Sequence, residues 1–446
     1  MIKYIFILFV SSVFFAACDK KLDLLPRQSV AEEIALTSDG NVKKVLNGAY
    51  DVLSFGSLYG GNLFLYSELL GANGEIRWEG TFNEPREIFQ KEIITTNAFI
   101  TTTWLQAYNT INISNNVLSA IDVVNAVDQN RVKGEAEFIR GSLYFELVKL
   151  FAKPYSAGNA TSNLGLSIVL TPTREINEAS YVARSTVEQT YAQIIADLTD
   201  AENLLPTSNG VYATKSAAGA MLSRVYLQMA RYADARDAAN RAITAATGKS
   251  LASTYAAAFN NTANSTEYIF AMQVTAQDGA NNMHLYWSIP TFGGRGGDVS
   301  VQASHLALYD PIDTRRTLFY SGAGAQRSGK WQLQYRNLPV IRLAELYLTR
   351  AEANMRLGTS VGATPLQDIN RTRQRAGLPA LVTVTLNDIF LERRLELAHE
   401  GHRIHDIKRL MGTADGLAYN DDKLVLPIPF REVNASKGVI VQNSGY

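Results

Sequence analysis

The amino-acid sequence predicts an all-α protein, built as a tetratricopeptide-like scaffold of helical hairpins with inserted irregular loops and minor β structure. Apolar residues recur at spacings of three and four along most of the chain, as they do on the buried face of a helix. Small residues face large ones across short turns, which is typical of helices that pack closely in pairs. Two stretches, residues 54–100 and 250–336, interrupt this pattern because they are rich in glycine, asparagine and aromatic residues. We therefore expect one helical body with two loop insertions.

The first residues have the pattern of a lipoprotein signal peptide. Lys3 supplies a basic start, and the run from Tyr4 to Ala17 is uncharged and largely apolar. This run is too short for a membrane-spanning helix, which needs about 20 residues, but it suits the apolar region of a signal peptide. Cys18, the only cysteine, follows Ala17 directly, so we predict cleavage before Cys18 and lipidation of its thiol. A plain signal peptide beside a chance cysteine is the alternative.

These features and the charge balance set the broad class of the protein. We predict a lipoprotein signal peptide over residues 1–17, a lipid-anchored tether over 18–40 and a single helical body over 41–446. A lipidated Cys18 leaves no thiol for a disulfide or a cysteine–metal site. The 42 basic and 42 acidic residues balance, so the chain offers no field for nucleic acid, and we expect no such partner.

Helical segments account for most of the body. The clearest lies between Thr186 and Pro206, where the apolar residues share one face. Ser185 and Glu188 predict a capping box at its start, and Pro206 marks its end. Further helices are expected over residues 101–124, 131–151, 214–230, 233–247, 338–358, 361–376 and 386–411. The hairpin at 217–243 and the pair 338–358 with 361–376 resemble tetratricopeptide units, and ordinary helical hairpins are the alternative.

The two irregular regions are where we expect a binding site, because long loops on a rigid scaffold commonly carry function. Three of the four tryptophans fall in these regions, whereas Trp104 lies in a helical pattern and is expected in the core. A flat aromatic ring can pack on the apolar face of a sugar while neighbouring polar groups bond its hydroxyls. The candidate ligand-binding residues are Asn73, Arg77, Trp78, Tyr286, Trp287 and Trp331. Local packing of each tryptophan is the alternative.

The most enzyme-like string is His399-Glu400-Gly401-His402-Arg403-Ile404-His405. A zinc-protease helix places two histidines four residues apart, whereas these stand three and six apart. On one helix they would point about 60° away from one another in succession. We therefore predict no metal site here, and an ion-paired structural helix with Glu400/Arg403 and His402/Asp406 as contact pairs.

Other enzyme chemistry has less support in the sequence. The segment 293–297 is rich in glycine but lacks the spacing of a dinucleotide or phosphate loop, so we expect a flexible loop. Glycoside hydrolysis needs two carboxylates about 5–9 Å apart. The acids that could supply them are Glu68, Glu75, Glu79, Glu84 and Glu87. Acids in a polar loop are more commonly solvated, and we predict a protein without enzymatic activity, cofactor or metal.

Ordered motifs run through the whole chain. They are Cys18–Pro26, Trp104–Leu118, Gly134–Phe145, Asp197–Pro206, Tyr309–Arg316, Pro339–Glu352, Asn370–Leu378, Glu392–Asp406, Leu426–Pro429 and Gln442–Tyr446. In this order they resemble the SusD/RagB family of outer-membrane nutrient-binding lipoproteins from Bacteroidetes. Ser444 stands where proline is usual in that family.

The resemblance implies a helical scaffold whose inserted loops form the ligand face. It also implies a lipoprotein at the surface of the outer membrane that binds an oligosaccharide and delivers it to a SusC-like, TonB-dependent transporter, over which it sits as a lid. A peptide-binding member of the same scaffold is one alternative, and a glycosidase using the loop carboxylates is another. A third is a helical interaction protein whose only ligand is the transporter barrel. The ligand-contacting loops of the family vary, so no binding motif carries over to this chain.

Overall fold

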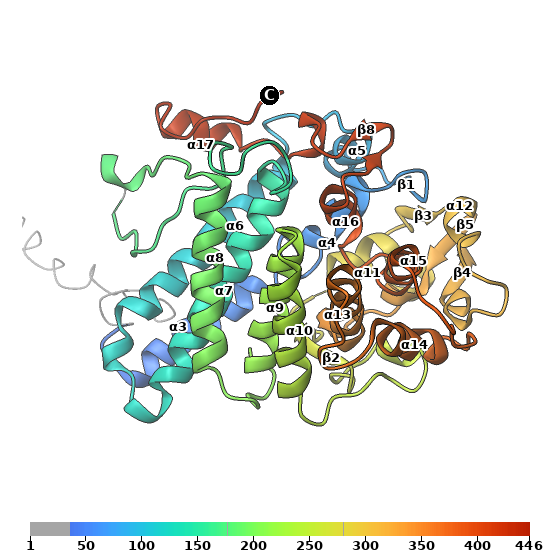
Figure 1. Ribbon diagram of the computed structural model, residues 1–446. Coiled ribbons are helices and arrows are strands. Elements are labelled where there is room, and N and C mark those ends of the chain that lie inside the picture. Colours follow the sequence, from blue (N-terminus) through green and yellow to red (C-terminus); the bar gives the residue numbers. More distant parts are fainter. Residues whose placement is uncertain (1–35, 176, 280) are drawn as a thin grey trace, which may run out of the picture.

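The computed structural model describes residues 36–175, 177–279 and 281–446 (Figure 1). The expected signal peptide, Cys18 and most of the expected tether lie outside these residues. Within the described ranges, no helix is both long enough and apolar enough to cross a bilayer.

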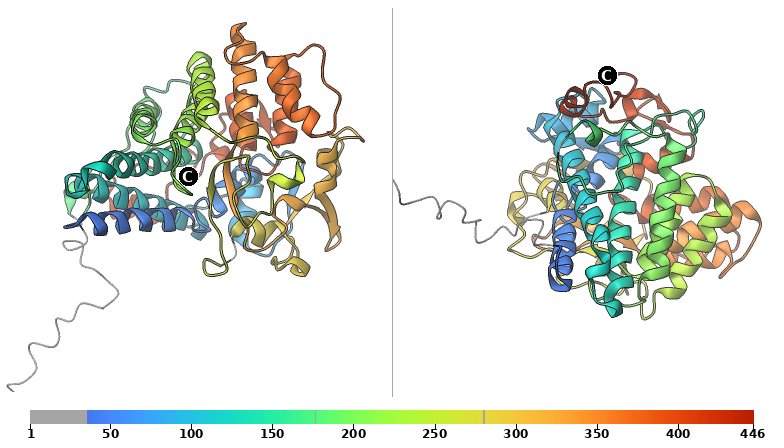
Figure 2. Two further views of the ribbon diagram at one scale, coloured as in Figure 1. Left: turned by 90° about the horizontal axis from the view of Figure 1, so that it is seen from below. Right: turned by 90° about the vertical axis from the view of Figure 1, so that its left-hand side faces the viewer.

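Long helices form one half of the molecule. They are α3 (Asp39–Leu53), α6 (Ala98–Ser119), α7 (Ala126–Phe151), α8 (Val187–Leu204), α9 (Lys215–Gln228) and α10 (Tyr232–Ala245). From α6 to α10 each helix packs on the next one along the chain, and α3 lies against α6 and α7. Figure 2 shows α3, α6 and α7 side by side at one end of the molecule. The predicted all-α class and its helical hairpins are confirmed.

The start of α8 differs by one residue from the prediction. Thr186, not Ser185, is the N-cap: its hydroxyl accepts from the Gln189 N–H (3.1 Å), and its own N–H donates to Gln189 Oε1 (2.9 Å). Ser185 cannot start the helix because its backbone is bonded to another segment, donating to the Leu166 carbonyl and accepting from the Gly165 N–H. A tertiary contact therefore selects the cap.

The other half contains α13 (Leu343–Leu357), α14 (Pro365–Arg375), α15 (Leu386–Glu396) and α16 (Arg403–Arg409). Helix α13 packs on α10, α14 and α15, so the succession of paired helices continues. The predicted helix at 338–358 is wrong at its start, where β6 (Leu338–Arg342) pairs antiparallel with β2 (Tyr268–Met272). Both strands are buried throughout, and a short run of buried apolar residues does not distinguish a strand from a helix.

The predicted helix at 386–411 is wrong in its middle. The chain leaves the helical conformation between α15 and α16, where His399 has φ +64° and Gly401 φ +82°. A Cβ on Gly401 would lie 2.6 Å from Cδ1 of Phe64, so glycine is required both for the left-handed backbone and for the close approach of α4 (Asn62–Leu70). The helical spacing of this segment therefore holds within α15 and within α16, and it does not extend through residues 397–402.

The two irregular regions contain short elements and pair with each other. Residues 54–100 hold α4, β1 (Ile76–Trp78) and α5 (Asn83–Gln90). The later region holds α11 (Asn282–Trp287), β3 (Val299–Val301), α12 (Ala303–Leu306), β4 (Phe319–Gly322) and β5 (Ala325–Ser328). Strand β1 pairs antiparallel with β3 in a four-stranded sheet of order β1-β3-β5-β4. The remaining elements near the C-terminus are β7 (Thr413–Ala414), β8 (Leu417–Ala418) and α17 (Phe430–Ala435).

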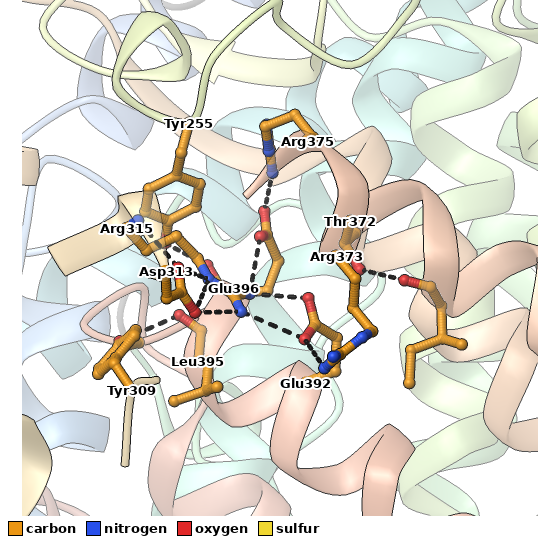
Figure 3. A network of polar contacts seen from close by, with 12 residues as sticks. Tyr255, Tyr309, Asp313, Arg315, Thr372, Arg373, Arg375, Glu392, Leu395 and Glu396 are labelled. Atoms are coloured by element: carbon orange, nitrogen blue, oxygen red, sulfur yellow. Dashed lines mark hydrogen bonds and ion pairs between the residues drawn. The ribbon is translucent and has the colours of Figure 1, made fainter. Parts of the chain in front are cut away.

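A network of buried charges joins the elements of the C-terminal half (Figure 3). Arg315 is 1% exposed and pairs with Asp313 at 2.7 Å. Glu396, which is completely buried, accepts from Arg375 and from Arg342 (2.9 Å). Burial raises the pKa of Glu396, but the neighbouring Arg375, Arg342 and Arg315 outweigh it and lower the pKa to about 2. Glu396 is therefore ionised at neutral pH and links α14, α15 and β6.

Candidate functional site

A surface basin of about 480 Å³ lies where the two irregular regions meet helix α6. Its described lining comes from three parts of the chain, which are residues 51–62, residues 99–106, and residues 273–279 with 281–282. Two of these stretches belong largely to the regions in which the sequence predicts a binding site. The volume is in the range of small-molecule sites, about 300–1,000 Å³.

The wall of the basin is held together by Asn282, the first residue of α11. Its backbone N–H donates to the Gly60 carbonyl (2.7 Å), and its side-chain amide donates to the Gly56 carbonyl (3.1 Å) and to Asn62 Oδ1 (2.9 Å). A Cβ on Gly56 would lie 2.7 Å from the Asn282 side chain, so glycine permits this close approach. Segments more than 200 residues apart in the sequence are thereby fixed against each other.

The basin combines aromatic rings with polar groups, most of which are neutral. Phe55 is 42% exposed, and Phe99 is half-buried at the start of α6. Around them stand the amides of Asn62, Gln106, Gln273, Asn281 and Asn282 and the hydroxyls of Ser54, Ser57 and Thr102. The Gln106 amide forms no hydrogen bond within the described part of the chain, so its donors and acceptor are available to a ligand. An exposed ring with convergent amides is suited to a ligand that has an apolar face and several hydroxyl groups.

The six residues expected to bind ligand do not line this basin. Asn73 and Arg77 are exposed on the segment around β1, and Asn73 Oδ1 accepts from the Asp415 N–H (3.0 Å). The four aromatic candidates are buried, with exposed fractions of 4% for Trp78, 3% for Tyr286, 0% for Trp287 and 5% for Trp331. The expectation that these tryptophans offer open faces to a sugar is therefore corrected, and the alternative of local packing describes them.

Each buried tryptophan has a packing partner. Trp78 Nε1 donates to the Phe82 carbonyl (3.2 Å), and its ring meets Tyr286 edge-on at 5.6 Å. Trp287 packs on the His399 ring at 4.6 Å. Trp331 Nε1 donates to the His399 carbonyl (3.0 Å). The sequence around these rings lacks periodicity and so predicts loops, yet the loops fold inward and add to the core. Trp104, expected in the core, is 2% exposed, as predicted.

Sequence reasoning missed Phe55, Phe99, Gln106 and Asn282. Phe55 lies between a helix and the Gly56 turn, which is a signal of an exposed loop tip. For Phe99 and Gln106 no such signal exists, because they lie on α6 and only the approach of α11 makes their face part of a site.

A second cleft of about 400 Å³ lies between residues 68–76 and α15–α16. It contains charged groups: Glu75 pairs with Arg394 (2.5 Å), Arg403 (2.8 Å) and His305 (2.9 Å). Burial raises the pKa of Glu75, but these partners outweigh it and lower the pKa to about 2. Glu68 has no such cation in hydrogen-bond contact within the described ranges, and burial raises its pKa to about 7.

Most of the acids considered for glycoside hydrolysis are bound in structural contacts. Glu68 and Glu75 were expected to be solvated but are 4% and 6% exposed. Glu68 accepts from the Gly401 N–H (2.8 Å) at the break between α15 and α16. Glu79 accepts from Ser300 (2.8 Å), and Glu87 accepts from Asn97 (2.8 Å). Four of the five acids therefore have an assigned structural contact.

The histidine string is polar and structural, but its contacts differ from the prediction. Glu400 pairs with Arg342 (2.7 Å) and Lys330 (2.5 Å), not with Arg403. Asp406 pairs with Arg393 and Arg409, not with His402. The predicted pairs assumed one helix, and the break at residues 397–402 removes that geometry. Among the described residues, no three potential metal ligands surround a common point.

The chain is thus a tetratricopeptide-like helical scaffold that carries an open basin of aromatic and amide groups on its inserted loops. Residues 22–227 match a family described as "Starch-binding associating with outer membrane", and residues 319–423 match the SusD family. The chain belongs to the SusD/RagB family of Bacteroidetes.

Similar proteins agree with this assignment. SusD-like protein P2 of Formosa agariphila is 26% identical, with 94% of each chain covered. Starch-binding protein SusD of Bacteroides thetaiotaomicron is 32% identical over 29% of this chain and 31% of its own length. A solved SusD superfamily protein from Bacteroides thetaiotaomicron superposes with a TM-score of 0.82 at 25% identity, covering 91% of this chain and 99% of that one.

Proposed function

We propose that this protein binds oligosaccharides in the basin between residues 51–62, 99–106, 273–279 and 281–282. It binds without chemistry of its own and delivers the ligand to a SusC-like, TonB-dependent transporter. In this proposal Cys18 carries the lipid that anchors the protein at the outer face of the outer membrane, and residues 18–40 are its tether.

The observation that carries the proposal is the chemistry of the basin. The exposed Phe55 ring can lie against the apolar face of a sugar ring, and the unbonded Gln106 amide can meet its hydroxyls. The basin is open and is built from the inserted loops, where a long polymer can enter from the surface.

The relatives support the same class of ligand. One is described as a starch-binding protein, and the family matched by residues 22–227 is described as associated with the outer membrane. The position of Cys18 directly after an apolar run supports the lipid anchor.

The experiment is a binding screen with the purified mature protein. Neutral and charged polysaccharides of plant, fungal and host origin are tested by affinity electrophoresis, and positive ligands are measured as oligosaccharides by calorimetry. We expect Phe55→Ala to weaken the affinity for the bound glycan about tenfold, equivalent to about 1.4 kcal/mol, because one aromatic stacking contact is lost.

Phe430→Ala is the matched control, because Phe430 is also exposed (55%) but lies on α17, outside the basin. The glycan affinity of the Phe430→Ala variant should equal that of the wild type. Equal glycan affinity of the Phe55 variant and the wild type would refute the assignment of the site, and release of shorter sugars during incubation would refute binding without chemistry.

The charged cleft favours a second candidate, peptide binding. Arg394 and Arg403 at Glu75 could exchange partners with the termini of a peptide, beside the apolar Phe390 and Leu391. A mixture of short peptides in the same screen distinguishes the two candidates, since peptide binding that Phe55→Ala leaves unchanged would favour the cleft.

A further inference from the structure

The basin is acidic and has no cation in its described lining. Asp51, in the last turn of α3, and Asp278, in the loop before α11, are both exposed at its edge. Among the described residues, Asp51 forms no ion pair, and Asp278 accepts only from the N–H and hydroxyl of Thr275 (both 2.7 Å). No lysine, arginine or histidine stands among the described residues that line the basin.

The remaining polar groups of the basin are neutral. Amides and hydroxyls bond the hydroxyl groups of a sugar, and a free carboxylate such as that of Asp51 can accept from them. A uronate carboxylate or a sulfate ester, in contrast, needs a cation or a set of donors to replace its water. The nearby Arg295 cannot serve, since it pairs with Asp298 (2.8 Å) and lies over the Phe82 ring at 3.8 Å, outside the lining.

We infer that the basin selects neutral oligosaccharides and rejects those that carry uronate or sulfate groups, with Asp51 and Asp278 as the selecting residues. This inference rests on the proposed function and names the substrate class of the same site. Repulsion does the selecting, because the two carboxylates act on any anion held between the loops.

The size of the effect follows from Coulomb's law. With an effective dielectric constant of about 30, between those of water and of a protein surface site, and with physiological salt, two like charges about 7 Å apart weaken binding roughly threefold. Two carboxylates therefore disfavour a singly charged ligand about tenfold.

The test compares two ligands of equal length with the same backbone, one neutral and one oxidised to the uronate. The neutral ligand is the best neutral oligosaccharide of the screen, and its primary hydroxyls are oxidised to carboxylates to make the partner. Both are titrated calorimetrically against the wild type and against the Asp51→Asn/Asp278→Asn double variant. The quantity measured is the ratio of neutral to anionic affinity.

Asp122→Asn/Asp200→Asn is the matched control. Asp122 and Asp200 are exposed and lie outside the basin. Their replacement by asparagine changes the net charge of the protein by the same amount as the basin variant does. This control separates charge in the basin from the overall charge of the protein.

We expect the wild type to prefer the neutral ligand about tenfold, the basin variant to lose most of that preference, and the control variant to keep it. A preference equal in the wild type and the basin variant, or tighter binding of the uronate by the wild type, overturns the inference. Glycan binding that depends on Phe55 but ignores charge refutes only this inference. Absence of binding to every glycan refutes the proposed function and this inference with it.

Discussion

Replacing Trp331 by alanine separates a residue of the core from a residue of the site. The Trp331 side chain is 5% exposed, packs on Phe259 with ring centroids 6.1 Å apart, and donates to the His399 carbonyl. Removing a buried tryptophan costs about 3–5 kcal/mol, and the orphaned His399 carbonyl adds about 1 kcal/mol. We expect a loss of about 5 kcal/mol in the free energy of unfolding.

The melting temperature translates this loss into a measurement. The unfolding entropy is about 2.1 cal/mol/K per residue. For a body of this size, a loss of 5 kcal/mol therefore lowers the melting temperature by roughly 5–6 °C. Differential scanning calorimetry records the shift. Glycan affinity of Trp331→Ala, measured 20 °C below its melting point, should equal that of the wild type.

Phe55→Ala should show the opposite pattern. Phe55 is 42% exposed, so its loss changes stability by less than about 0.5 kcal/mol, while glycan affinity falls about tenfold. The reasoning is refuted if Trp331→Ala remains folded and loses glycan affinity without losing stability, because Trp331 would then contact the ligand.

The buried charges make two further predictions. Arg315→Met leaves Asp313 without an ion-pair partner among the described residues, and we expect the free energy of unfolding to fall by about 3–5 kcal/mol. In a calorimetric comparison, adding Asp313→Asn should recover at least 1 kcal/mol. An Arg315→Met variant as stable as the wild type would contradict this prediction. Burial, with His305 and Lys330 nearby, holds the pKa of His399 well below its usual value, so below pH 6.5 the unfolded chain takes up a proton at His399 that the folded protein does not. The stability of the wild type relative to His399→Asn should therefore fall with a slope that approaches about 1.4 kcal/mol per pH unit, by about 1.7 kcal/mol in total from pH 6.5 to 5, and be flat above pH 7.5. Denaturant titrations at five pH values measure this difference, and parallel stability curves for both proteins would contradict it.

Helical periodicity is a local property, and it was predictable. The packed faces of α8, α9 and α10 repeat every three or four residues, so the sequence predicts their bounds closely. Spacing along the sequence does not predict a conformation that is decided by contact with a distant segment. The strand β6 and the break at Gly401 exist because β2 and α4 approach those segments from elsewhere in the chain.

The candidate site was predictable only as a region. The composition of residues 54–100 and 250–336 indicates where the helical scaffold is interrupted. It does not indicate which aromatic rings face water, because exposure depends on what packs against each ring. Trp287 and Phe55 are both aromatic residues of irregular stretches, yet one is completely buried and the other is 42% exposed.

The sequence by itself determined the helical scaffold, the family and the two regions that depart from the helical pattern. The spacing of apolar residues and the order of the motifs indicate these properties, and both depend on neighbours along the chain. The tertiary structure alone decided that the three tryptophans of the irregular regions are core, that Glu75 is paired with cations, and that Asn282 closes a basin with Gly56. Burial and charge pairing depend on contacts between segments hundreds of residues apart, and only the folded chain brings those segments together.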